Sequence, residues 1–304
     1  MANLRAIRRR INSIKSTQQI TRAMKMVAAS KLRLAQTRVE RTRPYAISLR
    51  EVIKRVSSAV IATNGDNGKF VHPLLTMPDK DSPRCFIVIS SDRGLCGSFN
   101  VNLLKFSEIH INPCISKGDE VTICAVGKRS LDYFRRRQRN VDKQYLGITT
   151  SPNYANALLI AEEIIDCFLK QKLVSIDLIF TRYFSAISYT PQLVRLLPVV
   201  GVGEIERNIG DSNDVKLLFE YIFEPNSKEV LDSLLPRYVA VIIYQALLES
   251  SASEHAARMM AMDNATKNAS DMIERLTLDL NKTRQAIVTR ELAEIVGGKE
   301  AVEA

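Results

Sequence analysis

The stretch that most constrains the fold is residues 237–296, sixty consecutive residues that contain neither proline nor glycine. Apolar residues recur through it in alternating steps of three and four, the pattern of a helix that packs along a partner helix. At 1.5 Å per residue this helix is roughly 90 Å long, far above the mean for globular domains. The seam positions are Leu231, Leu234, Tyr238, Val241, Gln245, Leu248, Ala252, His255, Met259, Met262, Thr266, Ala269, Ile273, Leu276, Leu280, Thr283 and Ile287.

A second heptad seam lies at the other end of the chain. Since isolated helices are rarely stable in water, the two seams predict that the terminal helices pair. A compact insert between their inner ends makes the pair antiparallel, and the longer C-terminal helix overhangs. The N-terminal seam positions are Leu4, Ile7, Ile11, Ile14, Gln18, Thr21, Lys25, Ala28, Leu32, Ala35, Val39, Thr42, Ala46, Leu49, Ile53, Val56 and Val60.

Two irregularities interrupt the N-terminal seam. Pro44 lies inside it, and we expect a kink there but no break, provided that solvent takes up the lost hydrogen bond. Three successive seam positions are polar, and we expect the apolar face to shift to neighbouring residues and to unwind the supercoil locally. The positions concerned are Gln18, Thr21 and Lys25 on the seam, and Ile20, Met24 and Val27 beside it.

Between the helices, the sequence predicts a small Rossmann-like α/β domain with a mixed sheet, so the fold class is α+β/α/β with an antiparallel coiled coil. The predicted divisions are an N-terminal helix over 1–60, a connector over 61–80, an α/β domain over 81–225 and a C-terminal helix over 226–304. Short β-branched runs alternate with helical stretches, which favours this class. The predicted strands are 85–89, 121–126, 176–180, 190–200 and 216–223, and the predicted helices are 101–109, 131–139 and 154–170.

Composition excludes several classes of protein. The longest uncharged apolar run, residues 238–248, is too short to span a bilayer. The Arg-rich N-terminus resembles an organellar transit peptide, but it carries the heptad seam and is expected to belong to the folded protein. The five cysteines include no CxxC pair, so we expect neither a disulfide framework nor a zinc site, and a reducing cytosol fits best.

The charge is concentrated at one end of the chain. Residues 1–60 hold fifteen Arg and Lys against only Glu40 and Glu51, while the whole chain has a net charge of +10. A basic helix surface favours an acidic partner, which is a nucleic acid, a lipid surface or an acidic protein loop. A nucleic-acid-binding coiled coil is therefore one alternative, although Tyr45 is the single aromatic residue there and offers no stacking platform. A plain solvated basic face is another.

No catalytic site is predicted. Cys96 lies in a loop between a strand and a helix, where α/β proteins place phosphate-binding or catalytic groups, but no histidine is near it in the sequence to act as a base. Gly127-Lys128 follows a strand as in a P-loop, yet Thr122 stands where that motif needs glycine and Arg129 where it needs Ser or Thr. Catalytic, cofactor-binding and metal-binding residues are each predicted to be none. An α/β enzyme with a stalk is the remaining alternative.

Four strings of residues resemble the gamma subunits of F-type ATP synthases, and they occur in the same order from the first helix to the last. They are ITRAMKMVAASK at 20–31, SDRGLCGSFN at 91–100, EHAARMMAMDNATKNA at 254–269 and NKTRQAIVTRELAEIVGG at 281–298. Motifs of this length and type are seldom shared by unrelated coiled coils. We therefore regard the chain as similar to this family, in its bacterial form.

The resemblance implies a non-catalytic rotor shaft that couples proton flow to ATP synthesis. It implies that one copy stands inside a ring of three alpha and three beta subunits, and that the α/β domain sits at the foot beside the epsilon subunit and the membrane c-ring. The shaft pushes each beta subunit in turn through conformations of different nucleotide affinity. No cofactor, no direct nucleotide binding and no nucleic-acid partner are implied.

The resemblance also implies where the shaft contacts the beta subunits, namely at Met24, Lys25, Arg284 and Gln285. It places the protein on the cytoplasmic face of a bacterial inner membrane as a peripheral protein, in agreement with the initiator Met directly before the first helix. The sequence departs from the family pattern at two places. They are Ser98-Phe99, where the family usually has Gly-Leu, and Lys299-Glu300, where it has small residues. The α/β domain lacks the cysteine-bearing insertion of chloroplast forms, so redox control is not expected.

Overall fold

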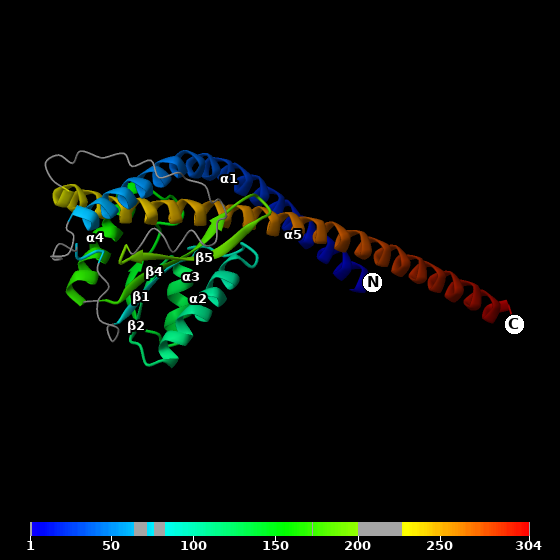
Figure 1. Ribbon diagram of the computed structural model, residues 1–304. Helices are drawn as coiled ribbons and strands as arrows, with labels where there is room; N and C mark the ends of the chain where they lie inside the picture. Colours follow the sequence, from blue (N-terminus) through cyan, green and yellow to red (C-terminus); the bar gives the residue numbers. More distant parts are fainter. Residues whose placement is uncertain (1, 64–71, 76–82, 172, 200–226, 304) are drawn as a thin grey trace. The chain divides into compact units, whose positions relative to one another are not determined.

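The protein divides into two compact units in a computed structural model, which describes residues 2–63, 72–75, 83–171, 173–199 and 227–303. The first unit is Met1–Ser30 with Arg258–Ala304, and the second is Lys31–Ala257. Two long helices, α1 (Ala2–Thr63) and α5 (Ser227–Glu303), contribute to both units (Figure 1).

The two long helices have the length that their seams predicted. α1 continues through Pro44, which is exposed. At an exposed position, water can donate a hydrogen bond to the backbone carbonyl that has lost its N–H donor, so the helix is not broken. α5 begins ten residues before the proline-free stretch and includes Pro236. In α1, every described seam position from Leu4 to Val56 is buried or half-buried. The heptad reading of both helices is confirmed where the residues are described.

A five-stranded mixed sheet forms the centre of the second unit, with the strand order β3-β2-β1-β4-β5. The first four of these strands are parallel to their neighbours, and β5 runs antiparallel to β4 in a hairpin. The strands are β1 (Arg84–Ile89), β2 (Val121–Val126), β3 (Val141–Tyr145), β4 (Ser175–Tyr183) and β5 (Tyr189–Leu197). The connecting helices are α2 (Phe99–Ser116), α3 (Lys128–Arg136) and α4 (Tyr154–Gln171).

Helices cover both faces of this sheet (Figure 1). α2 and α3 pack on one face, where Phe86 and Val88 of β1 meet Leu103 and Phe134. On the other face, α4 and the parts of α1 and α5 that belong to this unit share one larger apolar cluster with the alternate residues of the strands. Because both faces are covered, β1 is buried along almost its whole length, as expected for the centre of a parallel sheet.

The structure corrects several of the predicted elements. β3, an edge strand of polar composition, was not predicted from the sequence. α3 begins three residues before the helix predicted at 131–139. α2 extends beyond the predicted 101–109 at both ends. The strand predicted at 216–223, and most of the connector at 61–80, lie outside the described residues. The mixed character of the sheet is confirmed.

One described helix is long and apolar enough to cross a membrane by length and composition, over Glu229–Ala293 of α5. Core helices of globular proteins have the same length and composition. Val239, Val241 and Ile243 are all buried in the cluster against the sheet, so we interpret this segment as a core helix.

A buried carboxylate joins α5 to α1 within the second unit. Glu249 is 1 % exposed in its side chain, and its Oε1 accepts hydrogen bonds from Nε of Arg43 at 3.3 Å and from Nε2 of Gln245 at 3.0 Å. Arg43 also donates from Nη2 to the carbonyl of Tyr183, at the end of β4, at 2.7 Å. One arginine of α1 therefore connects α5 with the sheet.

Replacing this arginine should destabilise the protein, because the substitution Arg43→Met leaves a buried carboxylate short of a charged donor. We expect a loss of about 2 kcal/mol in the free energy of unfolding, the usual cost of removing one partner of a buried charged group. Urea denaturation of the full chain measures it. Arg41→Met, at an exposed position two residues away, is the control and should change the free energy by less than about 0.5 kcal/mol. Equal effects would contradict this role of Arg43.

Candidate partner-binding surfaces

The first unit is a pair of antiparallel helical segments held together along the predicted seam. Ile11 and Ala28 of α1 are buried, as are Met262 and Ala269 of α5. The hydrogen bonds between the two segments show that they are antiparallel. Gln18 bonds to Ser270, and Lys25, seven residues further along α1, bonds to Asp263, seven residues further back along α5. α5 also continues well past the start of α1 in this unit, as Figure 1 shows.

Polar side chains occupy the middle of this seam and pair with one another. Nε2 of Gln18 donates to Oγ of Ser270 at 2.7 Å, and the hydroxyls of Thr21 and Thr266 share a hydrogen bond of 2.8 Å. The ammonium of Lys25 lies 2.6 Å from a carboxylate oxygen of Asp263. These three successive pairs, which we call the polar ladder, fill the seam where apolar residues are missing.

The predicted shift of the apolar face is therefore wrong. Thr21 stays on the seam with 9 % exposure, whereas Ile20 and Val27, which were expected to replace the polar residues, are 60 % and 57 % exposed. The heptad continues through this region because each polar residue of α1 finds a polar partner on α5, so no free energy is gained by turning the helix. Met24 is half-buried.

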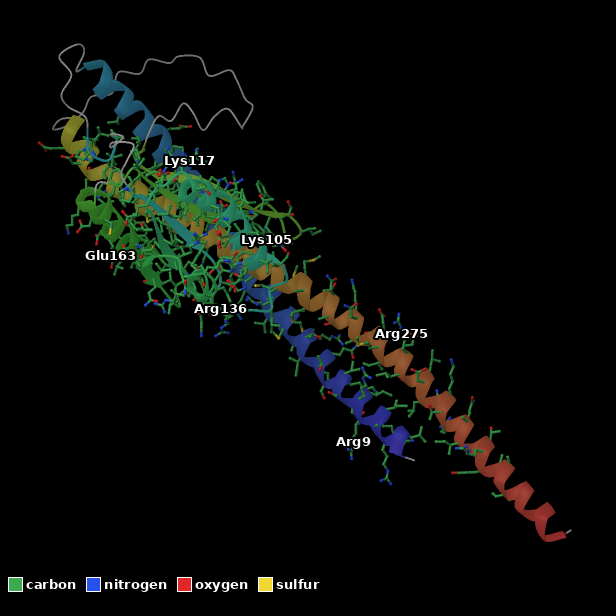
Figure 2. The ribbon with its side chains drawn as sticks, turned by 90° about the horizontal axis from the view of Figure 1, so that it is seen from below. Arg9, Lys105, Lys117, Arg136, Glu163 and Arg275 are labelled. Carbon is green, nitrogen blue, oxygen red and sulfur yellow. The ribbon has the colours of Figure 1, made fainter. Side chains whose placement is uncertain are left out.

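The outer surface of the N-terminal segment combines exposed apolar residues with cations. Ile20, Met26 and Val27 are exposed, and so are Arg8, Arg9 and the other cations of residues 2–22. In Figure 2 the side chain of Arg9 extends into solvent. No acidic residue occurs in residues 1–30. A surface of this composition suits a partner that presents carboxylates beside apolar side chains.

The structure places the four predicted contact residues at two positions of this unit. Arg284 and Gln285 are exposed on α5, near the level at which α1 begins, so neither is needed to fill the seam. Met24 lies at the edge of the seam. Lys25 is 43 % exposed in its side chain and already bonds to Asp263, so only its remaining donors can reach another subunit. This partner of Lys25 on α5 was not predicted from the seam pattern.

In the second unit, the carboxyl ends of the parallel strands form the edge where α/β proteins bind ligands. Here that edge is occupied by the protein's own groups. Oδ1 of Asp92, in the β1–α2 loop, accepts the backbone N–H groups of Lys128 (3.1 Å) and Gly147 (3.2 Å), and Oδ2 accepts the hydroxyl of Thr149 at 2.6 Å. A single carboxylate therefore connects the loops that follow β1, β2 and β3.

Gly127 and Cys96, which lie in the two loop motifs of the sequence, both have structural roles. A side chain at Gly127 would place its Cβ 2.4 Å from the carbonyl oxygen of Ser90, so only glycine fits between these loops. Cys96 is buried, and its sulfur accepts a hydrogen bond from Nδ2 of Asn100 at 3.1 Å. Phe99, at one of the departures from the family pattern, packs with Cys96 against Ala257 of α5. The loop thus joins the sheet to α5.

Two of the buried cysteines are poor nucleophiles. Burial raises the pKa of the Cys85 thiol to about 12, and burial also raises the pKa of Cys124 well above its usual value. Both thiols stay protonated and poorly nucleophilic at neutral pH. In the part of the chain that the structure describes, no three His, Cys, Asp or Glu side chains are grouped so that they could hold a metal ion.

Comparison with known proteins identifies the class of this chain. The family model described as ATP synthase matches residues 3–302. The chain is 44% identical over 303 residues to the ATP synthase gamma chain of Pelotomaculum thermopropionicum, covering 100% of both, and 42% identical to that of Moorella thermoacetica, covering 99% of this chain and 100% of the other. A chain of the Euglena gracilis mitochondrial ATP synthase has the same fold, with a TM-score of 0.69 and 21% identity over 99% of this chain and 95% of that one.

These matches show that the chain belongs to the ATP synthase family, and within it to the gamma chains. The resemblance stated from the four sequence strings is confirmed. The sequence alone left three classes open: a central shaft, a nucleic-acid-binding coiled coil and an enzyme with a stalk. Membership in this family selects the central shaft. The chain is a non-catalytic subunit of a membrane-associated complex.

The polar ladder should be visible in the titration of one carboxylate. Hydrogen bonds from Lys25 and from Lys267 lower the pKa of Asp263 below its ordinary value of 3.8. Because the folded-state pKa is lowered, the stabilisation is present above the unfolded pKa and is lost as the pH falls through the folded value. Lys25→Met should raise the pKa of Asp263 towards 3.8, as measured by NMR of the labelled carboxyl carbon.

The matched control for this titration is Lys15→Met, an exposed lysine on the same helix. It should leave the pKa of Asp263 unchanged. An Asp263 pKa that does not respond to Lys25→Met would show that the ammonium and the carboxylate are not paired in solution.

Proposed function

We propose that this chain is the central rotor shaft of the F1 sector of a proton-driven ATP synthase, and that it couples ion flow through the membrane to conformational change in the catalytic beta subunits. The observation that carries the proposal is the identity with gamma chains along the whole chain, from the paired helices of the first unit to the sheet of the second. The work of such a shaft is mechanical, since each rotational step changes which beta subunit it contacts.

The proposed partners are a ring of three alpha and three beta subunits around one copy of this chain, the epsilon subunit and the membrane c-ring. Two structures with the same fold support this arrangement, because they are described as the rotor and as the OSCP/F1/c-ring part of the Euglena gracilis enzyme. The exposed cations and apolar residues of residues 2–30 fit an acidic loop of a beta subunit. We place the foot, over the proposed domain boundaries 81–225, towards the epsilon subunit and the c-ring.

The proposed location is the cytoplasmic face of a bacterial inner membrane, as a peripheral protein. Its support is that the curated relatives at 42% and 44% identity come from bacteria. The helix 1–60 and the helix 226–304, joined to the foot through a connector at 61–80, then contain the part of the subunit that enters the ring, namely their segments in the first unit.

We propose that Met24, Lys25, Arg284 and Gln285 contact the beta subunits. Arg284 has a planar fork of donors suited to a carboxylate, and Gln285 has an amide that both donates and accepts. Both are exposed on α5 and available for such contacts. Met24, at the other of the two positions, supplies a flexible apolar surface, since methionine adapts to partners that change shape.

An interior proline should uncouple or dissociate the complex. Ala269 is buried on the seam of the first unit, and Ala269→Pro removes a backbone hydrogen bond and kinks α5 at a cost of about 3 kcal/mol. We expect the variant complex either to lose its alpha and beta subunits during purification or to hydrolyse ATP without pumping protons. Subunit stoichiometry and proton-coupled synthesis in membrane vesicles measure these outcomes.

The control is Ala269→Ser, which keeps the helix and the small volume. It should leave one copy of this chain in each purified ring and preserve most of the coupled synthesis. A wild-type chain that does not co-purify with alpha and beta subunits would contradict the proposed function itself. Normal synthesis by the proline variant would contradict the role of a continuous helix.

Removing the proposed contacts on α5 should impair the motor without unfolding the helix. We expect the double substitution Arg284→Ala with Gln285→Ala to lower ATP hydrolysis and synthesis about tenfold or to weaken assembly, which corresponds to about 1.4 kcal/mol of lost interaction. Helix content should be unchanged because alanine is the better helix former. Steady-state ATPase rates and circular dichroism give the two readouts.

Arg275→Ala is the control for the double variant. Arg275 is an exposed arginine of the same helix, nine residues before Arg284 (Figure 2), and its removal should change the ATPase rate little. Wild-type turnover by the double variant in an assembled complex would show that Arg284 and Gln285 are ordinary solvated side chains.

A further inference from the structure

A groove runs between α2 and α3 on the sheet face that lies opposite to α4. Its first part is a cavity of about 420 Å³ that is closed at one end by the β1–α2 loop. A second cavity of about 450 Å³ shares Tyr133 and Arg137 with the first, so the two are continuous along the helices. We call this feature the α2–α3 groove. It lies within the second unit and does not involve the paired helices of the first.

One wall of the groove is apolar and exposed. Val101 and Ile109 of α2 are each more than half exposed, and they are separated by eight residues, which places them on the same side of the helix. Leu95 of the β1–α2 loop is also more than half exposed. Its φ of 61° is uncommon for a residue with a side chain, and this backbone conformation directs an apolar group outward at the end of the groove.

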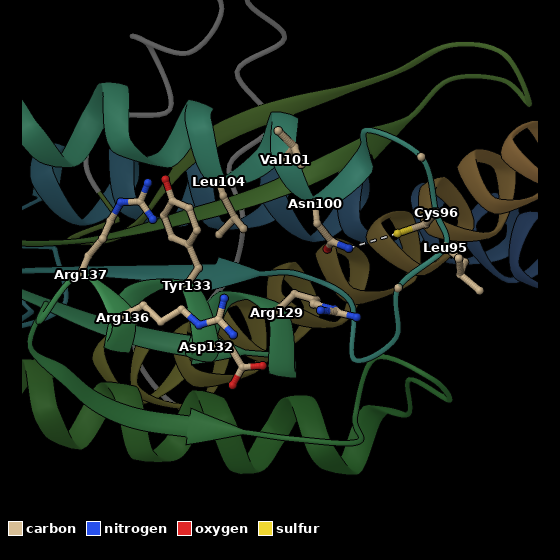
Figure 3. A pocket seen from close by; sticks show the side chains of 12 residues that line it. Leu95, Cys96, Asn100, Val101, Leu104, Arg129, Asp132, Tyr133, Arg136 and Arg137 are labelled. Carbon is tan, nitrogen blue, oxygen red and sulfur yellow. Dashed lines mark hydrogen bonds between the residues drawn. The ribbon is translucent and has the colours of Figure 1, made fainter.

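The other wall carries cations. Arg129 and Arg136 of α3 line the first cavity, and Figure 3 shows both side chains extending from α3. Neither takes part in any ion pair among the described residues, although Asp132 lies on the same helix between them. Arg137 stacks over the ring of Tyr133 at 3.8 Å, and it also pairs with Glu108 at 3.6 Å.

Glycine at position 94 leaves room for the guanidinium of Arg129. A Cβ at Gly94 would lie 2.7 Å from Nη2 of Arg129, so a larger residue there would move the guanidinium from its present position. The loop backbone and the arginine therefore lie close together at the end of the groove.

We propose that the α2–α3 groove binds an acidic, amphipathic segment of a neighbouring subunit in the assembled complex. The segment's apolar side chains would lie against Val101, Ile109 and Leu95, and its carboxylates would accept hydrogen bonds from Arg129 and Arg136. The argument is charge complementarity, since two arginines without ion-pair partners face an apolar wall along an open channel. The open, elongated form suits a peptide segment better than a small anion, which needs an enclosed pocket. The inference rests on the proposed function, because it takes the partner from the same complex.

Site-specific photocrosslinking in the purified complex tests the proposal. A chain with p-benzoylphenylalanine in place of Ile109 should crosslink on illumination to another subunit of the complex, at a segment rich in Asp and Glu. Mass spectrometry identifies the crosslinked peptide. The control has the same photoreactive residue in place of Leu159, an exposed leucine of α4 on the other side of the sheet, and should not crosslink to that segment.

Charge reversal on α3 tests the electrostatic part. Arg129→Glu with Arg136→Glu should lower the yield of the Ile109 crosslink about tenfold, which corresponds to about 1.4 kcal/mol. The control, Arg135→Glu with Lys117→Glu, makes the same change in charge outside the groove and should leave the yield within about twofold, an energy below 0.5 kcal/mol.

The outcomes separate this inference from the proposed function. If the chain co-purifies with alpha and beta subunits but the Ile109 variant crosslinks to no other subunit, the groove proposal fails alone. Crosslinking to lipid, to nucleic acid or to a segment without acidic residues also overturns it, as does a yield that the charge reversal leaves unchanged. If the chain does not co-purify, the proposed function fails as well.

Discussion

The fold depends on the burial of α5. The part of its circumference that must be buried differs along its length. Against the sheet, residues 239–243 and 246–257 are buried on every side, since strands, α4 and α1 together surround them. Between Met262 and Ile287, the least exposed positions follow a single heptad stripe. One uninterrupted helix thus serves as the core of a globular unit and as half of a coiled coil. Its buried surface accordingly changes along its length, from the whole circumference, where even Glu249 is buried, to one apolar stripe.

Much of this could be predicted from periodicity. The spacing of apolar residues predicted both helices and their antiparallel pairing, because a heptad seam shows which face of a helix must pack against a partner helix. The polar ladder could not be predicted in the same way, since Thr21 and Lys25 look unfavourable on a seam until Thr266 and Asp263 are placed opposite them. β3 was missed for a related reason: at the edge of the sheet its residues alternate between solvent and the sheet, so its apolar content is low.

The α/β unit has the strand arrangement of a ligand-binding domain without a free ligand-binding edge. Asp92 accepts three hydrogen bonds at the position where such domains hold a phosphate or a substrate, and Gly127 allows the second loop to approach Ser90 closely. These interactions brace the loops against one another. The sequence strings that identify the family include this loop, so a motif that looks catalytic in isolation has a structural purpose here.

The polar ladder also limits how the two helices of the first unit can align. If α1 slipped by one heptad along α5, Lys25 would face Ser270 or Ala256 in place of Asp263, and its charge would have no counter-ion. Apolar seam residues oppose such a slip less strongly, because an apolar side chain still meets an apolar surface after it. The three polar pairs therefore select one register of the two helices. The apolar seam residues supply the buried area, and the polar pairs decide which residues lie opposite one another.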